Sequence, residues 1–172
     1  WPVFSPDGQR IAYKVIDNGA ARLAMMDAQG GNQRTVYDRA FDHLAWSPGG
    51  KNLAVSGLDG EGGLDLLASD GIEAPVELTR GYYDDYPVYA NDGQYLLFTG
   101  NRCGNGNNQL GVFRINLINH DVTEVVCEAN ADFRYLSMTK DGRLVFTKGS
   151  AGTSSRPVLM TASTAQVQEV TI

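Results

Sequence analysis

Short apolar runs and polar turns follow one another along the chain, and the same arrangement recurs four times. Each copy has an apolar run, a tight polar turn and a second apolar run: VFSPDGQRIAY from Val3, AWSPGGKNLAV from Ala45, VYANDGQYLLF from Val88 and SMTKDGRLVFT from Ser137. The turn glycines are Gly8, Gly50, Gly93 and Gly142. A period of about 40–50 residues with several strands per copy is typical of β-propeller blades.

Within each copy, the apolar runs predict four antiparallel strands. In the first copy, Pro6 and Gly8 favour a type I turn that ends on a left-handed residue. The predicted strands are 3–5, 11–15, 23–26, 34–37, 43–47, 53–56, 64–68, 76–79, 86–90, 95–99, 111–117, 123–127, 135–139, 144–147, 158–161 and 168–172. No segment has helical periodicity. We therefore predict an all-β chain, a single domain over 1–172, of four consecutive four-stranded antiparallel β-propeller blades at about 1–40, 41–82, 83–132 and 133–172.

Such a sheet is apolar on both faces, so one blade cannot bury both faces alone. Phe4, Trp46, Tyr89 and Met138 occupy the same position in their copies, and we expect each to pack against a neighbouring blade. The chain is then stable only as an array of blades.

The motifs resemble the TolB-type propeller repeat, a relative of the WD repeat. They are PVFSPDGQRIAY and MMDAQGGNQRTV in the first copy, AWSPGGKNLAVSG in the second, DDYPVYANDGQYLLFTGNR in the third and SMTKDGRLVFTKG in the fourth. The resemblance covers nearly the whole chain and is more specific for fold than for function. Relatives of this kind close with six to eight blades, so four copies predict part of a larger propeller. The opening on Trp1, without a methionine, likewise indicates a cut from a longer precursor.

The resemblance implies a non-catalytic binding scaffold in the periplasm of a bacterium, with a protein or peptide partner. Two alternatives stay open: the periplasmic sensor domain of a membrane-bound CadC-like transcription regulator, and the accessory propeller of a serine peptidase. The residues agree with a chain that is not an enzyme and has no cofactor. The chain has two histidines, His43 and His120, but it has no Gly-x-Ser-x-Gly motif that would supply a nucleophilic serine for either of them to activate.

Charge and hydropathy exclude two classes of partner. The formal net charge is −6, and Lys and Arg form no run, which argues against nucleic-acid binding. No apolar stretch reaches the roughly 18–20 residues that cross a bilayer, so we expect no membrane insertion by this segment.

The candidate binding residues lie where the chain enters each inner strand. Asp42, Asp85 and Arg134 stand eight positions before a turn glycine, followed by His43, Tyr86 and Tyr135, and Tyr83 and Asp84 lie beside them. One interpretation is a ring of acids and tyrosines near the central channel that binds a basic peptide or a small polar ligand. The favoured interpretation is that the aspartates hydrogen-bond the backbone between blades and cap loops.

Two further features concern metal and disulfide chemistry. Asp59, Glu61 and Asp65 are a possible calcium set, but a solvated loop is the favoured interpretation and we expect no metal site. Cys103 and Cys127 end the second and fourth strands of the third copy on the same face, about 9–10 Å apart across one strand at ~4.8 Å spacing. A disulfide needs Cα atoms within about 7 Å, so the loop after Cys103 has to fold over to close it. We predict this disulfide, which would indicate an oxidising compartment.

Overall fold

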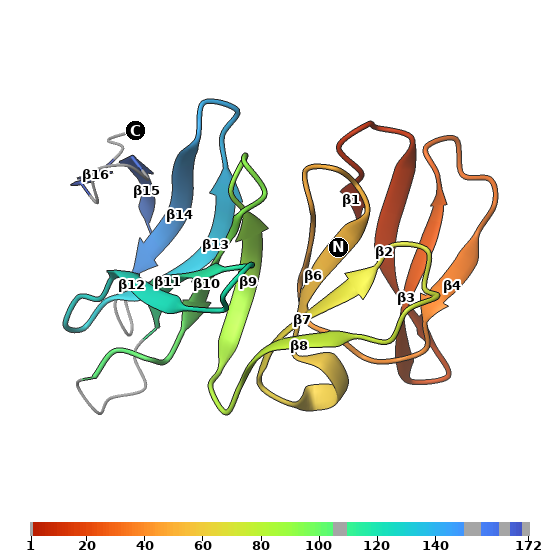
Figure 1. Ribbon diagram of the computed structural model, residues 1–172, viewed down its shortest axis with the longest axis horizontal. Coiled ribbons are helices and arrows are strands. Elements are labelled where there is room, and N and C mark those ends of the chain that lie inside the picture. Colours follow the sequence, from red (N-terminus) through yellow and green to blue (C-terminus); the bar gives the residue numbers. More distant parts are fainter. Residues whose placement is uncertain (1, 105–109, 150–155, 162–165, 170–172) are drawn as a thin grey trace. The chain divides into compact units, whose positions relative to one another are not determined.

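The computed structural model describes residues 2–104, 110–149, 156–161 and 166–169. The chain divides into two compact units, Trp1–Pro87 and Val88–Ile172, and each is described by itself. Strands make up nearly all of the regular structure in both units (Figure 1). No helix among the described residues is long and apolar enough to cross a membrane.

Unit 1 contains two four-stranded antiparallel sheets, each in simple chain order. The first sheet, blade 1, consists of β1 (Val3–Phe4), β2 (Arg10–Asp17), β3 (Ala20–Asp27) and β4 (Arg34–Tyr37). The second, blade 2, consists of β5 (Leu44–Trp46), β6 (Asn52–Ser56), β7 (Gly63–Ala68) and β8 (Val76–Arg80), with a short 3-10 turn, η1 (Leu58–Gly60), before β7.

Unit 2 contains the other two sheets, again in chain order. Blade 3 consists of β9 (Asp84–Tyr89), which begins within unit 1, and of β10 (Tyr95–Gly100), β11 (Gly111–Asn116) and β12 (Val122–Val126). Blade 4 consists of β13 (Asp132–Met138), β14 (Arg143–Gly149), β15 (Arg156–Thr161) and β16 (Gln166–Glu169). The predicted fold class of four four-stranded antiparallel blades is confirmed; the end of the last predicted strand, 170–172, lies outside the described residues.

The repeated turn between the first two strands of each blade has the predicted conformation. Gly8, Gly50, Gly93 and Gly142 have φ of 68°, 67°, 70° and 80°. In each blade the glycine N–H donates to the carbonyl three residues earlier, as from Gly8 to Ser5 at 2.8 Å. Positive φ costs a residue with a Cβ about 1–2 kcal/mol, so the glycine is required by the turn itself.

Two strands are longer than predicted. The second strand, predicted over 11–15, extends to Asp17 and pairs this residue with Ala20. Asn18 and Gly19 alone form the turn, with φ of 49° and 82°, because Asn-Gly suits the positive φ of a two-residue hairpin. The strand predicted over 64–68 begins one residue earlier, at Gly63.

The core of unit 1 lies between its two sheets. Leu23 and Met25 of blade 1 join Trp46 and Leu53 of blade 2 in one buried apolar cluster. The Trp46 indole N–H also donates to the carbonyl oxygen of Val3 at 3.1 Å. Blade 1 therefore covers one face of blade 2, as the repeat predicted.

Phe4 corrects one packing prediction. Its side chain is 60% exposed, whereas Trp46, at the same position of blade 2, is 7% exposed. The reason is that blade 1 packs on blade 2 through the opposite face of its sheet, which carries Leu23 and Met25. The face that carries Phe4 has no covering blade among the described residues of unit 1.

Arg10 fastens the two blades of unit 1. Its guanidinium donates to the Gly50 carbonyl at 2.8 Å and to the Ser69 hydroxyl at 3.2 Å. The same group lies 4.8 Å from the centre of the Trp46 ring, within reach of a cation–π interaction. A side chain from blade 1 thus holds the repeated turn of blade 2.

The core of unit 2 is built in the same way. Leu97 and Val112 of blade 3 share a buried cluster with Phe133 and Phe146 of blade 4. The two phenylalanine rings meet edge to face, with centroids 5.4 Å apart. The Asn91 amide donates to the carbonyls of residues 139 and 140, so a turn residue again joins adjacent blades.

Candidate functional site

Cys103 and Cys127 form a disulfide in the structure, with Cα atoms 5.8 Å apart. The sequence estimate of about 9–10 Å was wrong because it placed both cysteines at strand ends. Cys103 lies beyond the end of β10, and the bridge crosses β11 at Gly111. A Cβ on Gly111 would lie 2.5 Å from one sulfur and 2.6 Å from the other. The bond crosses the middle strand where that strand has no side chain.

Asp85, one of the candidate binding residues, is buried and accepts three hydrogen bonds. Its carboxylate accepts from the Ser56 hydroxyl at 2.5 Å and from the Tyr86 N–H at 2.8 Å. The third partner is the His43 imidazole, whose Nδ1 lies 2.8 Å away. Burial opposes ionisation of Asp85, but the hydrogen bonds outweigh it and hold its pKa below the ordinary value. The contacts agree with the favoured structural interpretation of this aspartate.

Ser56, His43 and Asp85 have the residue types of a hydrolase triad but not its order of contacts. In a triad the histidine accepts the proton of the serine hydroxyl. Here the Ser56 hydroxyl donates to Asp85 and accepts from the His43 backbone N–H at 3.1 Å. The serine is also only 1% exposed. This set cannot present an activated nucleophile to a substrate.

Asp84 is likewise buried and lies within β9, not in a loop. It accepts from the Thr79 hydroxyl at 2.6 Å, and this hydroxyl accepts from the Leu64 N–H at 3.0 Å. The carboxylate therefore joins the start of β9 to strands β7 and β8.

Asp42, Tyr83 and Tyr86 complete the candidates in unit 1. Asp42 is exposed and its carboxyl lies against Gly57, where a Cβ would come within 2.2 Å of Oδ2. Tyr83 is 53% exposed. The Tyr86 ring packs on the His43 ring with centroids 4.1 Å apart.

Arg134 and Tyr135 lie in unit 2. Arg134 is exposed and forms an ion pair with Asp132 at 2.8 Å. Tyr135 has φ of 56°, and its counterpart Tyr86 in blade 3 has φ of 50°. Positive φ in a bulky residue is strained, and in blade 4 it coincides with a β-bulge between Arg134 and Ser137.

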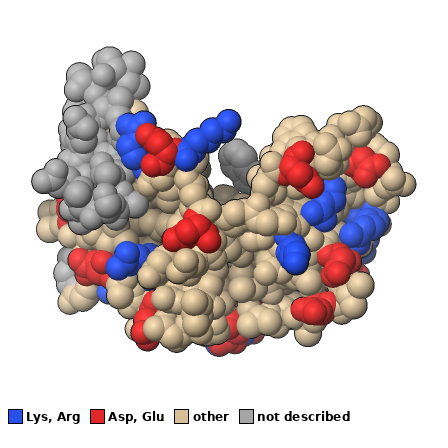
Figure 2. All heavy atoms as spheres, turned by 45° about the horizontal axis from the view of Figure 1, so that its top comes forward, with Lys and Arg blue, Asp and Glu red and all other residues tan. Residues whose placement is uncertain are grey.

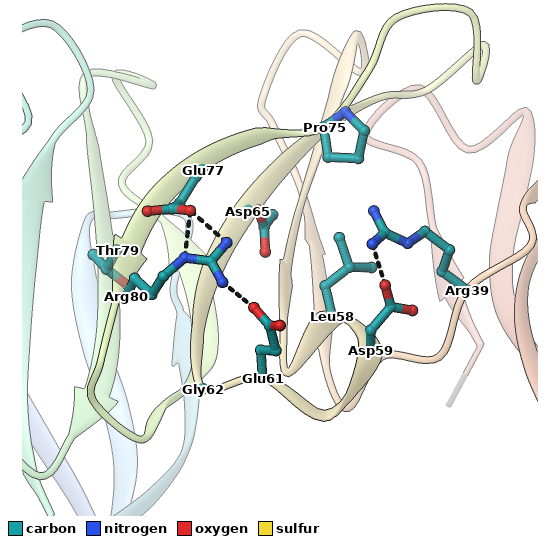
Figure 3. A pocket seen from close by; sticks show the side chains of 10 residues that line it. All are labelled: Arg39, Leu58, Asp59, Glu61, Gly62, Asp65, Pro75, Glu77, Thr79 and Arg80. Atoms are coloured by element: carbon teal, nitrogen blue, oxygen red, sulfur yellow. Dashed lines mark hydrogen bonds and ion pairs between the residues drawn. The ribbon is translucent and has the colours of Figure 1, made fainter.

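A pocket on blade 2 is the concave site that the sequence did not predict as a whole (Figure 3). Its volume is about 220 Å³. It is lined by residues of the segment before β5, of loop 57–63, of β7 and of the chain through β8: Arg39, Leu58, Asp59, Glu61, Gly62, Asp65, Pro75, Glu77, Thr79 and Arg80. The hydroxyl of Thr79, one of these lining residues, donates to the Asp84 carboxylate. Gly62, another lining residue, lies against the Tyr82 backbone, and a Cβ there would be 2.5 Å from the Tyr82 carbonyl oxygen. Asp84, one of the candidate residues of β9, therefore contacts a residue that lines this pocket.

Arginines pair with three of the four carboxylates in the pocket. Arg80 contacts both Glu61 and Glu77, and Arg39 contacts Asp59 (Figure 3). The carboxylate of Asp65 lies between these two groups and makes no hydrogen bond or ion pair with any residue that the structure describes. Burial raises the pKa of Asp65 more than the nearby Arg80 lowers it.

The calcium interpretation of this loop has no support in the geometry. Asp59 and Glu61 face arginines instead of converging with Asp65. Within the described ranges, no three His, Cys, Asp or Glu side chains are grouped so as to hold a metal ion.

On the face drawn in Figure 2, acidic and basic side chains are interspersed, and no broad basic patch is visible.

One feature of the sequence could have indicated the pocket: two acidic residues, Asp65 and Glu77, that the strand register places opposite each other. Asp65 of β7 and Glu77 of β8 are cross-strand partners in the register of blade 2. Like charges directly opposite each other destabilise a sheet, so such a pair calls for a nearby cation. The register needed to see it also depends on a β-bulge between Leu64 and Asp65, which the sequence did not reveal.

No protein-family model and no curated protein matches the sequence. Solved structures do match. A putative TolB of Agrobacterium tumefaciens has a TM-score of 0.84 at 22% identity, with 96% of this chain and 62% of that chain covered. TolB of Acinetobacter baumannii has a TM-score of 0.83 at 18% identity, with 99% and 42% covered.

A puromycin-hydrolyzing peptidase of Mycobacterium tuberculosis is similar at a TM-score of 0.72 and 16% identity, with 99% of this chain and 31% of that chain covered. The chain thus has the fold of TolB-type β-propellers and spans less than two thirds of these proteins.

Proposed function

We propose that this chain is a non-catalytic binding scaffold, a TolB-like propeller that binds a protein or peptide partner in the bacterial envelope. The observation that carries the proposal is the exposed pair Tyr82 and Tyr83, 45% and 53% exposed, directly before the buried Asp84 and Asp85. Aromatic side chains held on a rigid base are typical of protein interfaces, because they contribute large contact areas at low entropic cost.

The likeness in fold to two TolB structures supports a scaffold, and its fit exceeds that to the peptidase. The contacts of Ser56 and His43 support a chain without catalysis of its own. The disulfide supports an extracytoplasmic location, since disulfides persist in oxidising compartments such as the periplasm.

Photo-cross-linking in the source bacterium tests the proposal. A benzophenone amino acid at Tyr83 should give a discrete adduct with one envelope protein. The same substitution at Ile118, which is 81% exposed after β11, is the matched control and should give none. No adduct from Tyr83, or equal adducts from both positions, would contradict the proposal.

Absence of catalysis is tested separately. A fluorophosphonate probe, which labels activated serines, should leave Ser56 unmodified, because its hydroxyl is buried and bonded to a carboxylate. Labelling of Ser56 found by peptide mass spectrometry would overturn the non-catalytic assignment.

The accessory propeller of a serine peptidase is the second candidate, favoured by the likeness to the Mycobacterium tuberculosis peptidase. Sequencing the reading frame that encodes the chain separates the candidates. A hydrolase domain in that frame would support the peptidase, and a winged helix with one membrane span would support a sensor domain.

A further inference from the structure

The pocket on blade 2 has an excess of negative charge that its own arginines do not balance. Four carboxylates line it, against two guanidinium groups. Arg80 is held by Glu61 and Glu77, and Arg39 is held by Asp59. The remaining carboxylate, Asp65, is half-buried and has no partner among the described residues.

The strand register makes the position of Asp65 unfavourable. Asp65 and Glu77 face each other across β7 and β8, where like charges destabilise the pairing. Burial further disfavours the charged form of Asp65 and raises its pKa. Arg80 pairs with Glu77 and offsets part of this cost, but its effect on the pKa of Asp65 is smaller than that of burial. A second cation beside Asp65 would relieve the remainder.

The size and walls of the pocket limit what this cation can be. A volume of about 220 Å³ is below the roughly 300–1,000 Å³ of sites for drug-sized ligands. It suits a single long side chain. Leu58 and Pro75 supply apolar surface for the methylene groups of such a chain, and Asp65 lies at the centre (Figure 3).

We propose that this pocket receives a lysine or arginine side chain from a basic segment of the partner protein, with Asp65 as the principal contact. The side chain of Tyr82 is exposed and its backbone carbonyl lies beside Gly62 of the pocket lining, so Tyr82 would contact the residues that flank the cation. The proposal rests on the scaffold function above and defines the chemistry of its partner.

Nuclear magnetic resonance titration of the nitrogen-15-labelled chain tests the pocket. The probe is the pentapeptide Gly-Gly-Lys-Gly-Gly with blocked ends, and the matched probe has norleucine in place of lysine. The lysine peptide should cause saturable shifts in the amides of loop 57–63 and of β7 and β8, and the norleucine peptide should not. Absent or non-saturable shifts with the lysine peptide would overturn the proposal.

Two variants identify the contact. Asp65→Asn should weaken lysine-peptide binding by about tenfold or more, because it removes a charge-assisted contact. Glu124→Gln makes the same charge change on an exposed position of β12 and should leave binding unchanged. Equal weakening by both variants would mean diffuse attraction to an acidic chain and would overturn the proposal.

The comparison of the two peptides on the unsubstituted chain decides the question even if Asp65→Asn fails to fold. It also separates this inference from the scaffold proposal. A partner cross-linked at Tyr83 together with no lysine binding would overturn the pocket alone. Lysine binding in the pocket without any cross-linked partner would support the pocket and contradict the scaffold.

Discussion

Single residues in this chain hold the propeller together through buried polar contacts as well as through apolar packing. Near the start of β9, the Asp85 carboxylate is hydrogen-bonded to a serine hydroxyl, a backbone N–H and a histidine imidazole. Asp84 is likewise hydrogen-bonded to Thr79. Removing a buried acceptor leaves its donors unsatisfied, at a cost of about 1–3 kcal/mol each. These aspartates support the exposed tyrosines beside them.

Asp85 should make the stability of the chain depend on pH. Its folded pKa lies below the ordinary 3.8, so the carboxylate stabilises the fold above that pH. This stability is lost as the pH falls through the folded pKa. Asp85→Asn should therefore lower the free energy of unfolding by about 1–3 kcal/mol near pH 7, and by less near pH 3. Urea denaturation at both values measures this, with Asp42→Asn as the exposed control. An equal loss at both pH values would contradict the account.

Gly111 should be required for the disulfide. Gly111→Ala places a methyl group within 2.6 Å of both sulfurs, so either the bond or strand β11 has to move. We expect a loss of about 2–4 kcal/mol in unfolding free energy, comparable to loss of the bond. Gly104→Ala, whose Cβ would meet nothing within 4 Å, is the control. Thiol titration and thermal unfolding report the result, and a variant with an intact bond and unchanged stability would refute this role.

At the scale of elements, turn chemistry and strand alternation carry most of the information. The four turn glycines and the short apolar runs predicted the sixteen strands because both signals are local. The pocket was not predictable in this way. It combines Arg39 from the segment after β4 with Asp65 and Glu77, which meet only through the register of two strands. The path of the disulfide likewise depended on a glycine in a third strand.

Two adjacent glycines test the turn directly. Gly50 has φ of 67°, whereas Gly49 does not have positive φ, and a Cβ on Gly49 would meet nothing within 4 Å. Gly50→Ala should destabilise the chain by about 1–2 kcal/mol. Gly49→Ala should be neutral or slightly stabilising, because it reduces the entropy of the unfolded chain. Chemical denaturation of the two variants should separate them, and equal effects would contradict the turn assignment.

At the scale of the whole molecule, the chain is a quasi-repetitive array whose blades bury one another's faces within each unit. The repeat predicts this scaffold but does not identify a partner, because the repeated motif encodes the blades themselves. In the function proposed above, the acids of loop 57–63 and the tyrosines that follow β8 would select the partner. The likeness in fold to TolB structures agrees with the motifs, and the larger closed ring stays a prediction.

Hydrogen–deuterium exchange of the chain, alone and with the partner cross-linked through Tyr83, tests the central claim most directly. If blade 2 binds a basic segment through its pocket, amides in loop 57–63 and in residues 76–86 should exchange more slowly in the complex. The amides of unit 2 should be unaffected. Protection confined to unit 2, or no protection in loop 57–63, would contradict the account.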